Sequence, residues 1–181
     1  SMAELARSVE GALQHHDVVL VERFIAGREI TVGILDGRVL GALEIAPKSG
    51  VYDFESKYTP GRTDYFQPAR IPPTRLRGVL NLAERAAKAL DCTGAVRVDL
   101  LVTEGENEYV LEVNTLPGMT ETSLLPKIAS AAGYDFGALC EAMLEGARLH
   151  QGTLRSRAAT RVSRVERVEA APQAPLRRVA S

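Results

Sequence analysis

The apolar positions of the chain repeat with two different periods. In residues 2–14 and 74–90 they recur every three or four positions, as on one face of an amphipathic helix. Elsewhere, shorter segments are rich in β-branched and other apolar residues, which predicts strands. The predicted strands are residues 18–21, 29–35, 38–45, 94–103 and 108–114.

Turn and cap residues indicate how these segments connect. Asp36-Gly37 lies between two predicted strands and favours a tight hairpin, because both turn residues must adopt a positive φ. Ser123 can cap a helix that runs to about Ala132, and Asp135 can cap another that runs to about Leu149. Hairpin-linked strands form antiparallel sheets, so we expect an α+β fold in which flanking helices cover one face of an antiparallel sheet.

Charge divides the chain near residue 150. Residues 151–181 contain seven arginines and two glutamates, whereas the whole chain has a net charge of −1, so the preceding residues are mildly acidic. We expect residues 1–150 to form one domain and residues 151–181 to be a basic, disordered tail that proteolysis removes. This distribution argues against nucleic-acid binding.

Two further features bear on the compartment. No segment approaches the roughly 20 consecutive apolar residues of a membrane helix, so no membrane partner is expected. Cys92 and Cys140 lie far apart without the spacing of a metal site. We interpret them as buried thiols of a cytoplasmic protein rather than as a disulfide.

Four polar side chains occupy alternate positions of the last two predicted strands. Arg97 and Asp99 share one face of the first strand, and Glu112 and Asn114 share one face of the second. If the two strands pair, the three oxygen-bearing side chains lie within about 5–7 Å of each other and suit Mg²⁺, while Arg97 can hold an anionic oxygen. The alternative is a solvent-facing polar stripe. Alternation assigns the opposite face to Val96, Val98, Leu100, Leu111 and Val113.

Three connecting segments are also candidates for chemistry. Residues 48–64 lack an apolar period, and we predict a mobile lid there whose Lys57 can close over a triphosphate. The link from Glu22 to Glu29 can offer backbone groups to an adenine and a carboxylate to ribose hydroxyls. The glycine-containing loop after Asn114 leads into a helix start, where free backbone N–H groups favour an anion. Each has a simpler alternative as an ordinary surface loop or turn.

The order and spacing of these motifs resemble the D-alanine–D-alanine ligases of the ATP-grasp superfamily. The shared patterns are Glu-x6-Glu, Tyr-Asp-x3-Lys-Tyr, Arg-x-Asp and Glu-x-Asn-x-x-Pro-Gly-Met-Thr, and the resemblance runs from about Val18 to Leu149. It implies the carboxy-terminal lobe of an ATP-grasp fold. Such enzymes also have an amino-terminal domain and a central lobe with lysines that grip ATP from the other side, and residues 1–17 contain no counterpart of either.

The resemblance implies roles for individual residues. For ATP, Glu22 and the backbone near Ile25 lie at the adenine hinge, Glu29 binds the ribose, Lys57 contacts phosphate, and Leu111 is a further nucleotide-binding residue. For two Mg²⁺ ions, with Mn²⁺ as a substitute, the implied ligands are Asp99, Glu112 and Asn114. For catalysis and substrate binding, Arg97 and the Gly118 backbone stabilise a tetrahedral intermediate, Tyr58 lies over the site, and Ser123 with Leu124 binds the carboxylate of the second D-alanine.

The implied activity is the ATP-dependent joining of two D-alanine molecules for peptidoglycan precursor synthesis. ATP and D-alanine are the expected partners, and a homodimer is an open alternative for the full-length protein. Two other functions stay open from the sequence. One is an ATP-grasp-like binding or regulatory module without turnover, and the other is a ligase with a different dipeptide or depsipeptide product.

Overall fold

The computed structural model describes residues 1–48, 59, 61–105, 107–120 and 123–148. Most of the predicted lid, including Lys57 and Tyr58, lies outside the described residues, and so does the predicted tail. The expectations about lid mobility and tail disorder therefore stay predictions.

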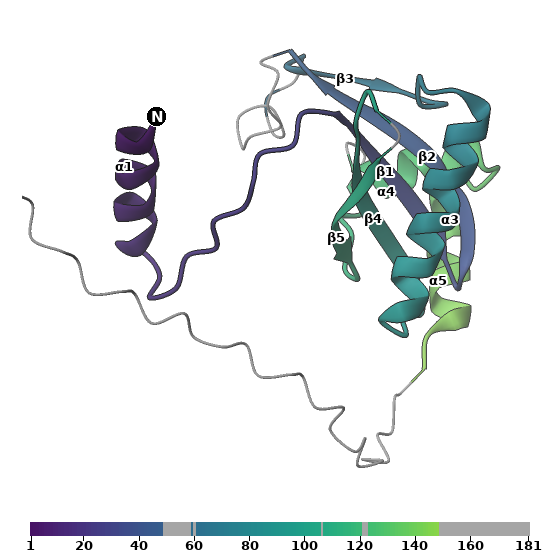
Figure 1. The fold of residues 1–181 in the computed structure, drawn as a ribbon. Helices are drawn as coiled ribbons and strands as arrows, with labels where there is room; N and C mark the ends of the chain where they lie inside the picture. The colour runs from purple at the N-terminus through teal and green to yellow at the C-terminus, as the bar shows by residue number, and fades with distance from the viewer. Residues whose placement is uncertain (49–58, 60, 106, 121–122, 149–181) are drawn as a thin grey trace, which may run out of the picture. The chain divides into compact units, whose positions relative to one another are not determined.

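The described helices and strands follow the predicted order except for one added strand, Thr63–Phe66, and one predicted strand, residues 18–21, that is absent. They are α1 (Met2–Leu13), β1 (Arg28–Leu35), β2 (Arg38–Pro47), β3 (Thr63–Phe66), α3 (Pro73–Ala89), β4 (Ala95–Val102), β5 (Glu108–Asn114), α4 (Leu124–Ala131) and α5 (Phe136–Gly146). The strands form one five-stranded sheet in the order β3-β2-β1-β4-β5, and every neighbouring pair is antiparallel (Figure 1). The predicted α+β fold with an antiparallel sheet is confirmed.

β1 is the central strand of this sheet. It pairs with β2 through the predicted hairpin, in which Asp36 has a φ of 47° and Gly37 a φ of 79°. Its other edge pairs with β4, so Thr31 lies opposite Asp99 although 68 residues separate them. Both edges of β1 are therefore saturated with backbone hydrogen bonds.

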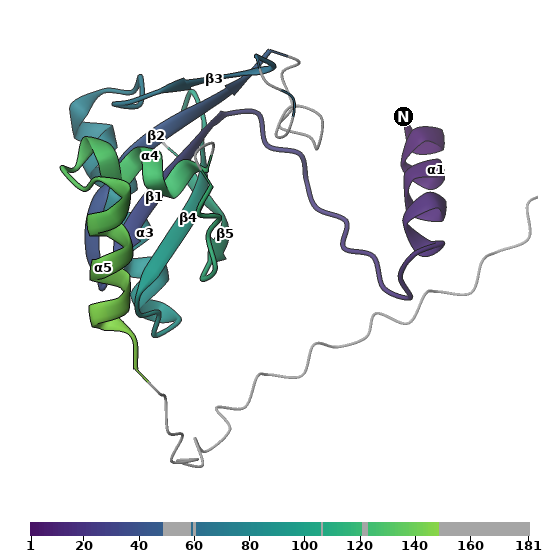
Figure 2. The ribbon, with the colours of Figure 1, turned by 180° about the vertical axis from the view of Figure 1, so that it is seen from behind.

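Helices cover both faces of the sheet, so the prediction that they cover one face is wrong. Val79, Ala83 and Ala87 of α3 belong to a core with one face of β1 and β4. Residues of α4 and α5, among them Leu125 and Leu139, pack on the opposite face (Figures 1 and 2). The physical reason is that β1 and β4 carry apolar residues at both parities, and a strand of this kind must be buried on both sides.

The predicted strand at residues 18–21 is not present. Val18 and Leu20 are 84% and 79% exposed, and the segment between α1 and β1 contains no strand. A β-branched run becomes a strand only where a neighbour supplies hydrogen bonds, and both edges of β1, which follows this segment, are already paired. The apolar face of α1 likewise contains no buried residue.

Strand β3 has no counterpart among the predicted elements. It is four residues long and pairs with the end of β2, with Thr63 opposite Pro47. The backbone N–H of Lys48 donates to the carbonyl of Arg62 at 2.9 Å, which extends this pairing. Thr63 and Asp64, the last two residues of the predicted lid, therefore belong to a strand. So short a strand is specified by its partner rather than by its own sequence.

The remaining sequence expectations concern cysteines and membrane segments. Cys92 and Cys140 are both free thiols, as predicted, but they are half-buried rather than buried. Among the described helices, none combines the length and apolar character needed to cross a membrane.

Gly33 allows α4 to approach β1 closely. A Cβ at this position would lie 3.0 Å from Ile128 Cγ2 and 3.1 Å from Leu125 Cδ1, both of which are side-chain atoms of α4. Those side chains are buried in the core on this face, so they have little room to move. The absence of a side chain at Gly33 therefore sets the distance between sheet and helix.

We predict that Gly33→Ala destabilises the domain by about 1–3 kcal/mol, the usual range for overpacking a core. Gly78→Ala is the matched control, since Gly78 lies in α3 and a Cβ there meets no atom within 4 Å. Ala is favoured over Gly inside a helix by about 0.5–1 kcal/mol, so this control should stabilise the protein. Urea unfolding of the two variants measures both effects, and equal stabilities would contradict the packing argument.

Candidate nucleotide and metal site

Helices α4 and α5 pack on only part of one face of the sheet, and the rest of this face is open. Register and alternation place Glu29, Thr31, Asp99 and Leu101 on this face, and all four lie between its helix-covered end and the start of β1. Residues two positions apart in a strand are separated by about 6.6–6.8 Å. The pocket at Glu29 and the charged cluster at Asp99 are therefore neighbours on a single surface.

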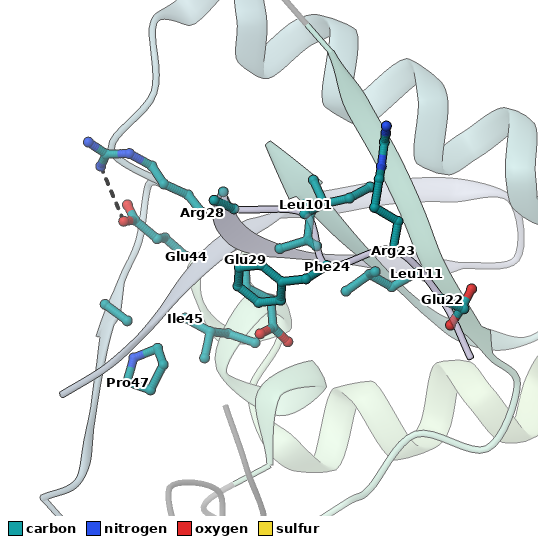
Figure 3. A pocket seen from close by; sticks show the side chains of 14 residues that line it. Glu22, Arg23, Phe24, Arg28, Glu29, Glu44, Ile45, Pro47, Leu101 and Leu111 are labelled. Atoms are coloured by element: carbon teal, nitrogen blue, oxygen red, sulfur yellow. Dashed lines mark hydrogen bonds and ion pairs between the residues drawn. The ribbon is translucent and has the colours of Figure 1, made fainter. Parts of the chain in front are cut away.

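A cavity of about 690 Å³ lies at the Glu29 end of this face. Its apolar wall includes Phe24, Ile45, Leu101 and Leu111, and Figure 3 shows these side chains around the Glu29 carboxylate. The complete lining consists of Glu22, Arg23, Phe24, Ile25, Ala26, Gly27, Arg28, Glu29, Glu44, Ile45, Ala46, Pro47, Leu101 and Leu111. The resemblance assigns five residues to ATP. Four of them, Glu22, Ile25, Glu29 and Leu111, line this one cavity, and the fifth, Lys57, lies outside the described residues.

Leu111 reaches this cavity because of a β-bulge. Asp99 pairs with Glu112 and Leu100 pairs with Val110, so Leu111 is an extra residue on β5. A bulge interrupts the alternation of side chains, and simple alternation therefore assigned Leu111 to the wrong face. Leu111 is 51% exposed and lines the cavity rather than the core under α3.

Gly27 brings the start of β1 across the end of β4. A Cβ on Gly27 would lie 2.9 Å from the carbonyl oxygen of Val102, a backbone atom that cannot move aside cheaply. The glycine thus permits the close approach that brings the segment from Glu22 to Ala26 over the cavity. Phe24 also lines the cavity, and the sequence motifs do not select it. The feature that could have indicated it is that Phe24 is an aromatic residue within the Glu22–Glu29 link.

Beside the cavity, Arg97 and Asp99 form a buried ion pair. Arg97 is 7% exposed and Asp99 is 6% exposed. Arg97 Nε donates to Asp99 Oδ1 at 3.0 Å, and Arg97 Nη2 donates to Asp99 Oδ2 at 2.8 Å. This two-pronged geometry fixes both side chains, and it offsets part of the cost of removing the charges from water.

Glu112 and Asn114 complete the predicted cluster. They lie directly opposite Asp99 and Arg97 respectively, so the predicted pairing of the two strands is confirmed. Glu112 Oε1 lies 3.5 Å from Arg97 Nη2, and this same nitrogen bonds Asp99 Oδ2 at 2.8 Å, so these two carboxylate oxygens lie within about 7 Å of each other. That the Asn114 oxygen joins them at a shared ion site stays a prediction. Asn114 Oδ1 accepts a hydrogen bond from the backbone N–H of Leu116 at 3.0 Å.

The donor atoms of this cluster fit a hard divalent cation. Two carboxylates and an amide oxygen are the ligand types that Mg²⁺ prefers, and the Glu112 side chain is 59% exposed toward the open face. Within the described ranges, no group of three or more His, Cys, Asp or Glu side chains is placed to hold a metal. The candidate cluster is of another kind, because its third oxygen ligand is the amide of Asn114.

The loop before α4 brings Gly118 and Ser123 together. A Cβ on Gly118 would lie 2.8 Å from Ser123 Oγ. Ser123 occupies the N-cap position of α4, but its hydroxyl does not cap the helix and instead accepts from the Thr120 backbone N–H at 3.0 Å. The Leu124 side chain is buried in the core against β2, so its backbone is the part that remains for binding a ligand.

A second buried charge, Glu44, lies at the margin of the cavity. Its side chain is 3% exposed and accepts hydrogen bonds from the backbone and side chain of Arg70 and from Arg28 (Figure 3 shows the Arg28 contact). Burial by itself raises the pKa of Glu44, but the hydrogen bonds from Arg70 and the charges of Arg70 and Arg28 outweigh it, so the pKa lies below its ordinary value. This cluster ties β1 and β2 to the segment after β3.

The lowered pKa makes a pH-dependent contribution to stability. An unfolded glutamate titrates near about pH 4.3, so the stabilisation from Glu44 is fully present above that pH and is lost as the pH falls through the lower folded pKa. We predict that Glu44→Gln lowers the unfolding free energy at pH 7 by about 1.5–3 kcal/mol, the usual value of hydrogen bonds to a charged group. The difference from the unmodified protein should shrink below about pH 4.3.

Urea unfolding between pH 3 and pH 7 measures this difference. Glu84→Gln is the control, because Glu84 pairs with Lys88 on the surface of α3, where such pairs contribute about 0.3–0.5 kcal/mol. A deficit of Glu44→Gln that stays constant down to acidic pH would contradict the assigned direction of the pKa shift.

Comparisons with known proteins point to one family. The sequence profile of the family described as "D-ala D-ala ligase C-terminus" matches residues 1–145. Over 148 residues the chain is 53% identical to the D-alanine--D-alanine ligase of Syntrophotalea carbinolica. The aligned region covers 82% of this chain and 48% of that protein. The chain is 49% identical over 147 residues to the D-alanine--D-alanine ligase of Anaeromyxobacter sp. strain K, an alignment that covers 81% of this chain and 48% of that protein. The chain thus spans about half the length of the curated relatives it matches.

Solved structures agree. The D-alanine--D-alanine ligase from Bacillus anthracis complexed with ATP superimposes with a TM-score of 0.69 at 34% identity, covering 81% of this chain and 46% of that chain. The VanG D-Ala:D-Ser ligase from Enterococcus faecalis gives a TM-score of 0.68 at 32% identity, with 79% and 43% covered.

Proposed function

The chain belongs to the family of D-Ala-D-Ala ligase carboxy-terminal domains, and we propose that it is the nucleotide- and magnesium-binding lobe of a ligase that joins two D-alanine molecules at the expense of ATP. The observation that carries this proposal is the placement of the cavity beside the charged cluster. Glu29 and Asp99 lie on adjacent strands of one open face, so a nucleotide in the cavity can direct its phosphates toward the carboxylates. The product would serve peptidoglycan precursor synthesis.

In this proposal the cavity binds the adenosine part of ATP. The apolar wall of Phe24, Leu101 and Leu111 excludes water from the adenine, and Glu22 and the Ile25 backbone supply hydrogen bonds to it. The Glu29 carboxylate accepts hydrogen bonds from the ribose hydroxyls. The structure of the Bacillus anthracis enzyme with ATP is consistent with this use of the fold.

Asp99, Glu112 and Asn114 are the residues that would hold Mg²⁺, two ions in the proposal. When bound, these ions spread the negative charge of the phosphate that is transferred. The contribution of the chain itself is to fix the oxygens: Asp99 is held by Arg97, and Asn114 is held by the Leu116 backbone. Oxygens that are already oriented need no reorganisation during the reaction.

Arg97 and the loop at Gly118 would act on the reacting carbonyl. ATP transfers a phosphoryl group to the carboxylate of one D-alanine and becomes ADP. The amine of the second D-alanine attacks the resulting acyl phosphate and loses a proton, and phosphate then leaves the tetrahedral intermediate as the amide forms. The intermediate carries a negatively charged oxygen, which Arg97 and the Gly118 backbone N–H stabilise because this charge develops only on the way to the intermediate. Ser123 and the Leu124 backbone, at the start of α4, bind the carboxylate of the second D-alanine, where the helix dipole favours an anion.

A chimaera tests the proposed activity. Residues 1–147 replace the matching half of the Syntrophotalea carbinolica ligase, to which the chain is 53% identical. We expect the chimaera to release phosphate from ATP only when D-alanine and Mg²⁺ are present, and to form D-alanyl-D-alanine. Asp99→Asn should abolish the reaction, because it removes a carboxylate from the cation site while preserving side-chain volume.

The acceptor is tested in the same assay. D-serine and D-lactate replace the second D-alanine, since the VanG relative is a D-Ala:D-Ser ligase. Phosphate release with D-serine or D-lactate, but not with D-alanine as the acceptor, would show that the product is not D-alanyl-D-alanine. A folded chimaera that binds ATP but turns over none of the three substrates would support a binding module and contradict the ligase.

We predict that the 181-residue chain without such a partner releases phosphate far more slowly than the usual enzyme range of about 1–10³ per second. One lobe holds the triphosphate from one side and leaves it in contact with water, which weakens the electrostatic interactions at Arg97 and the cation site. A coupled phosphate-release assay with ATP, Mg²⁺ and D-alanine measures the rate. Turnover in the usual range, abolished by Asp99→Ala, would show that this lobe is sufficient.

A further inference from the structure

A buried hydroxyl binds the carboxylate of Asp99 from the side of β1. Thr31 has no exposed surface, and its Oγ1 donates a hydrogen bond of 2.6 Å to Asp99 Oδ1. The proposed reaction assigns no part to Thr31. Its neighbours Ile30 and Val32 point into the core under α3, so Thr31 is the one of these three that faces the charged cluster.

The two oxygens of Asp99 have different partners. Each carboxylate oxygen has about two lone-pair directions for accepting hydrogen bonds. Oδ1 uses them for Thr31 Oγ1 and for Arg97 Nε at 3.0 Å. Oδ2 accepts from Arg97 Nη2 at 2.8 Å, and its second hydrogen bond is a longer one, 3.3 Å, from the Nε donor that it shares with Oδ1. The weakest of these four hydrogen bonds is on Oδ2, so a further ligand on Oδ2 displaces less than one on Oδ1.

The strand order gives this difference a direction. β4 lies between β1 and β5, so Thr31 and Glu112 lie on opposite sides of Asp99. The bond to Thr31 turns Oδ1 toward β1. Oδ2 shares the nitrogen Arg97 Nη2 with Glu112 Oε1, which lies 3.5 Å from that nitrogen, so Oδ2 is turned toward β5.

We propose that Thr31 is a positioning residue for a divalent cation: by engaging Oδ1, it presents Oδ2 of Asp99 as the single oxygen that meets the cation beside Glu112 and Asn114. The proposal rests on the cation site of the proposed function. Threonine suits this task because its branched side chain has few rotamers and packs in a strand, while its hydroxyl can donate to the carboxylate. Hydrogen bonds to metal-ligating carboxylates orient them in the same way in other proteins.

The test compares variants that differ in one hydroxyl. Thr31→Val keeps the branched shape and removes the donor, and Thr31→Ser keeps the donor and removes a methyl group. Thr103→Val is the matched control. The Thr103 hydroxyl donates to the Asn107 carbonyl at 3.1 Å in the turn that joins β4 to β5, the strands that carry Asp99 and Glu112. Binding of Mn²⁺ to the full 181-residue chain is measured by the electron paramagnetic resonance signal of the free ion, and urea unfolding checks that each variant is folded.

We expect Thr31→Val to weaken Mn²⁺ binding by about 10–100-fold, the usual effect of removing a hydrogen bond to a metal ligand. Thr31→Ser and Thr103→Val should bind Mn²⁺ as the unmodified chain does. If Thr31→Val does not fold, Thr31→Cys takes its place, because a thiol of similar size is a weak donor.

Asp99→Asn separates failure of this inference from failure of the proposed function. If Asp99→Asn loses Mn²⁺ binding while Thr31→Val keeps it, the cation site stands and the role of Thr31 is overturned. A loss in Thr103→Val as large as that in Thr31→Val would also overturn it, because the effect would then follow general stability. If the unmodified chain binds no Mn²⁺, or Asp99→Asn binds it equally well, the cation site of the proposed function fails and the inference fails with it.

Discussion

The pairing of β4 with β1 on one edge and with β5 on the other is the constraint on which the rest of the structure depends. This pairing places Asp99 between Thr31 and Glu112, and it places Arg97 opposite Asn114. A shift of either pairing by one residue would turn the charged side chains into the core under α3 and the apolar ones toward the open face. The apolar face of β4, buried against α3, therefore fixes the register that assembles the candidate site.

The two faces of the sheet have different uses. Under α3 the sheet buries a continuous apolar core, which contributes most of the hydrophobic stabilisation. The opposite face is divided along each strand, so that Leu35 and Ala95 pack with α4 and α5 while Glu29 and Leu101 stay open and line the cavity. The charged cluster lies between these regions, where one side is dry and the other is open to ligands. Such a boundary strengthens electrostatic interactions without closing the site.

In the part of the chain that the structure describes, the buried charged side chains are all hydrogen-bonded, and this explains how the open face tolerates them. Asp99 is bound by Arg97 and Thr31, and Glu44 is bound by Arg28 and Arg70. Among the described residues, no buried side-chain nitrogen or oxygen lacks a hydrogen-bond partner. An unpaired charge at either position would strongly destabilise the fold, because a buried charge without a partner loses its interaction with water. The pairs therefore keep charges oriented at a surface where the proposed reaction needs them.

The sequence by itself determined the features that depend on neighbours along the chain. The parity of Arg97 and Asp99, the hairpin at Asp36-Gly37 and the amphipathic helix of α3 follow from local rules, and the structure confirms them. The family motifs likewise selected Glu22, Ile25, Glu29 and Leu111 for ATP, and the structure brings these four residues to one cavity.

Only the tertiary structure decided the features that need a partner distant in sequence. Residues 18–21 have strand composition but no strand to pair with, whereas the short β3 is a strand because β2 extends alongside it. Leu111 leaves the alternation of β5 because the bulge is a property of the pairing with β4, and Thr31 meets Asp99 across 68 residues. Hydrogen bonds between strands satisfy backbone groups only in a specific register, and that register is chosen by burial on both faces of the assembled sheet.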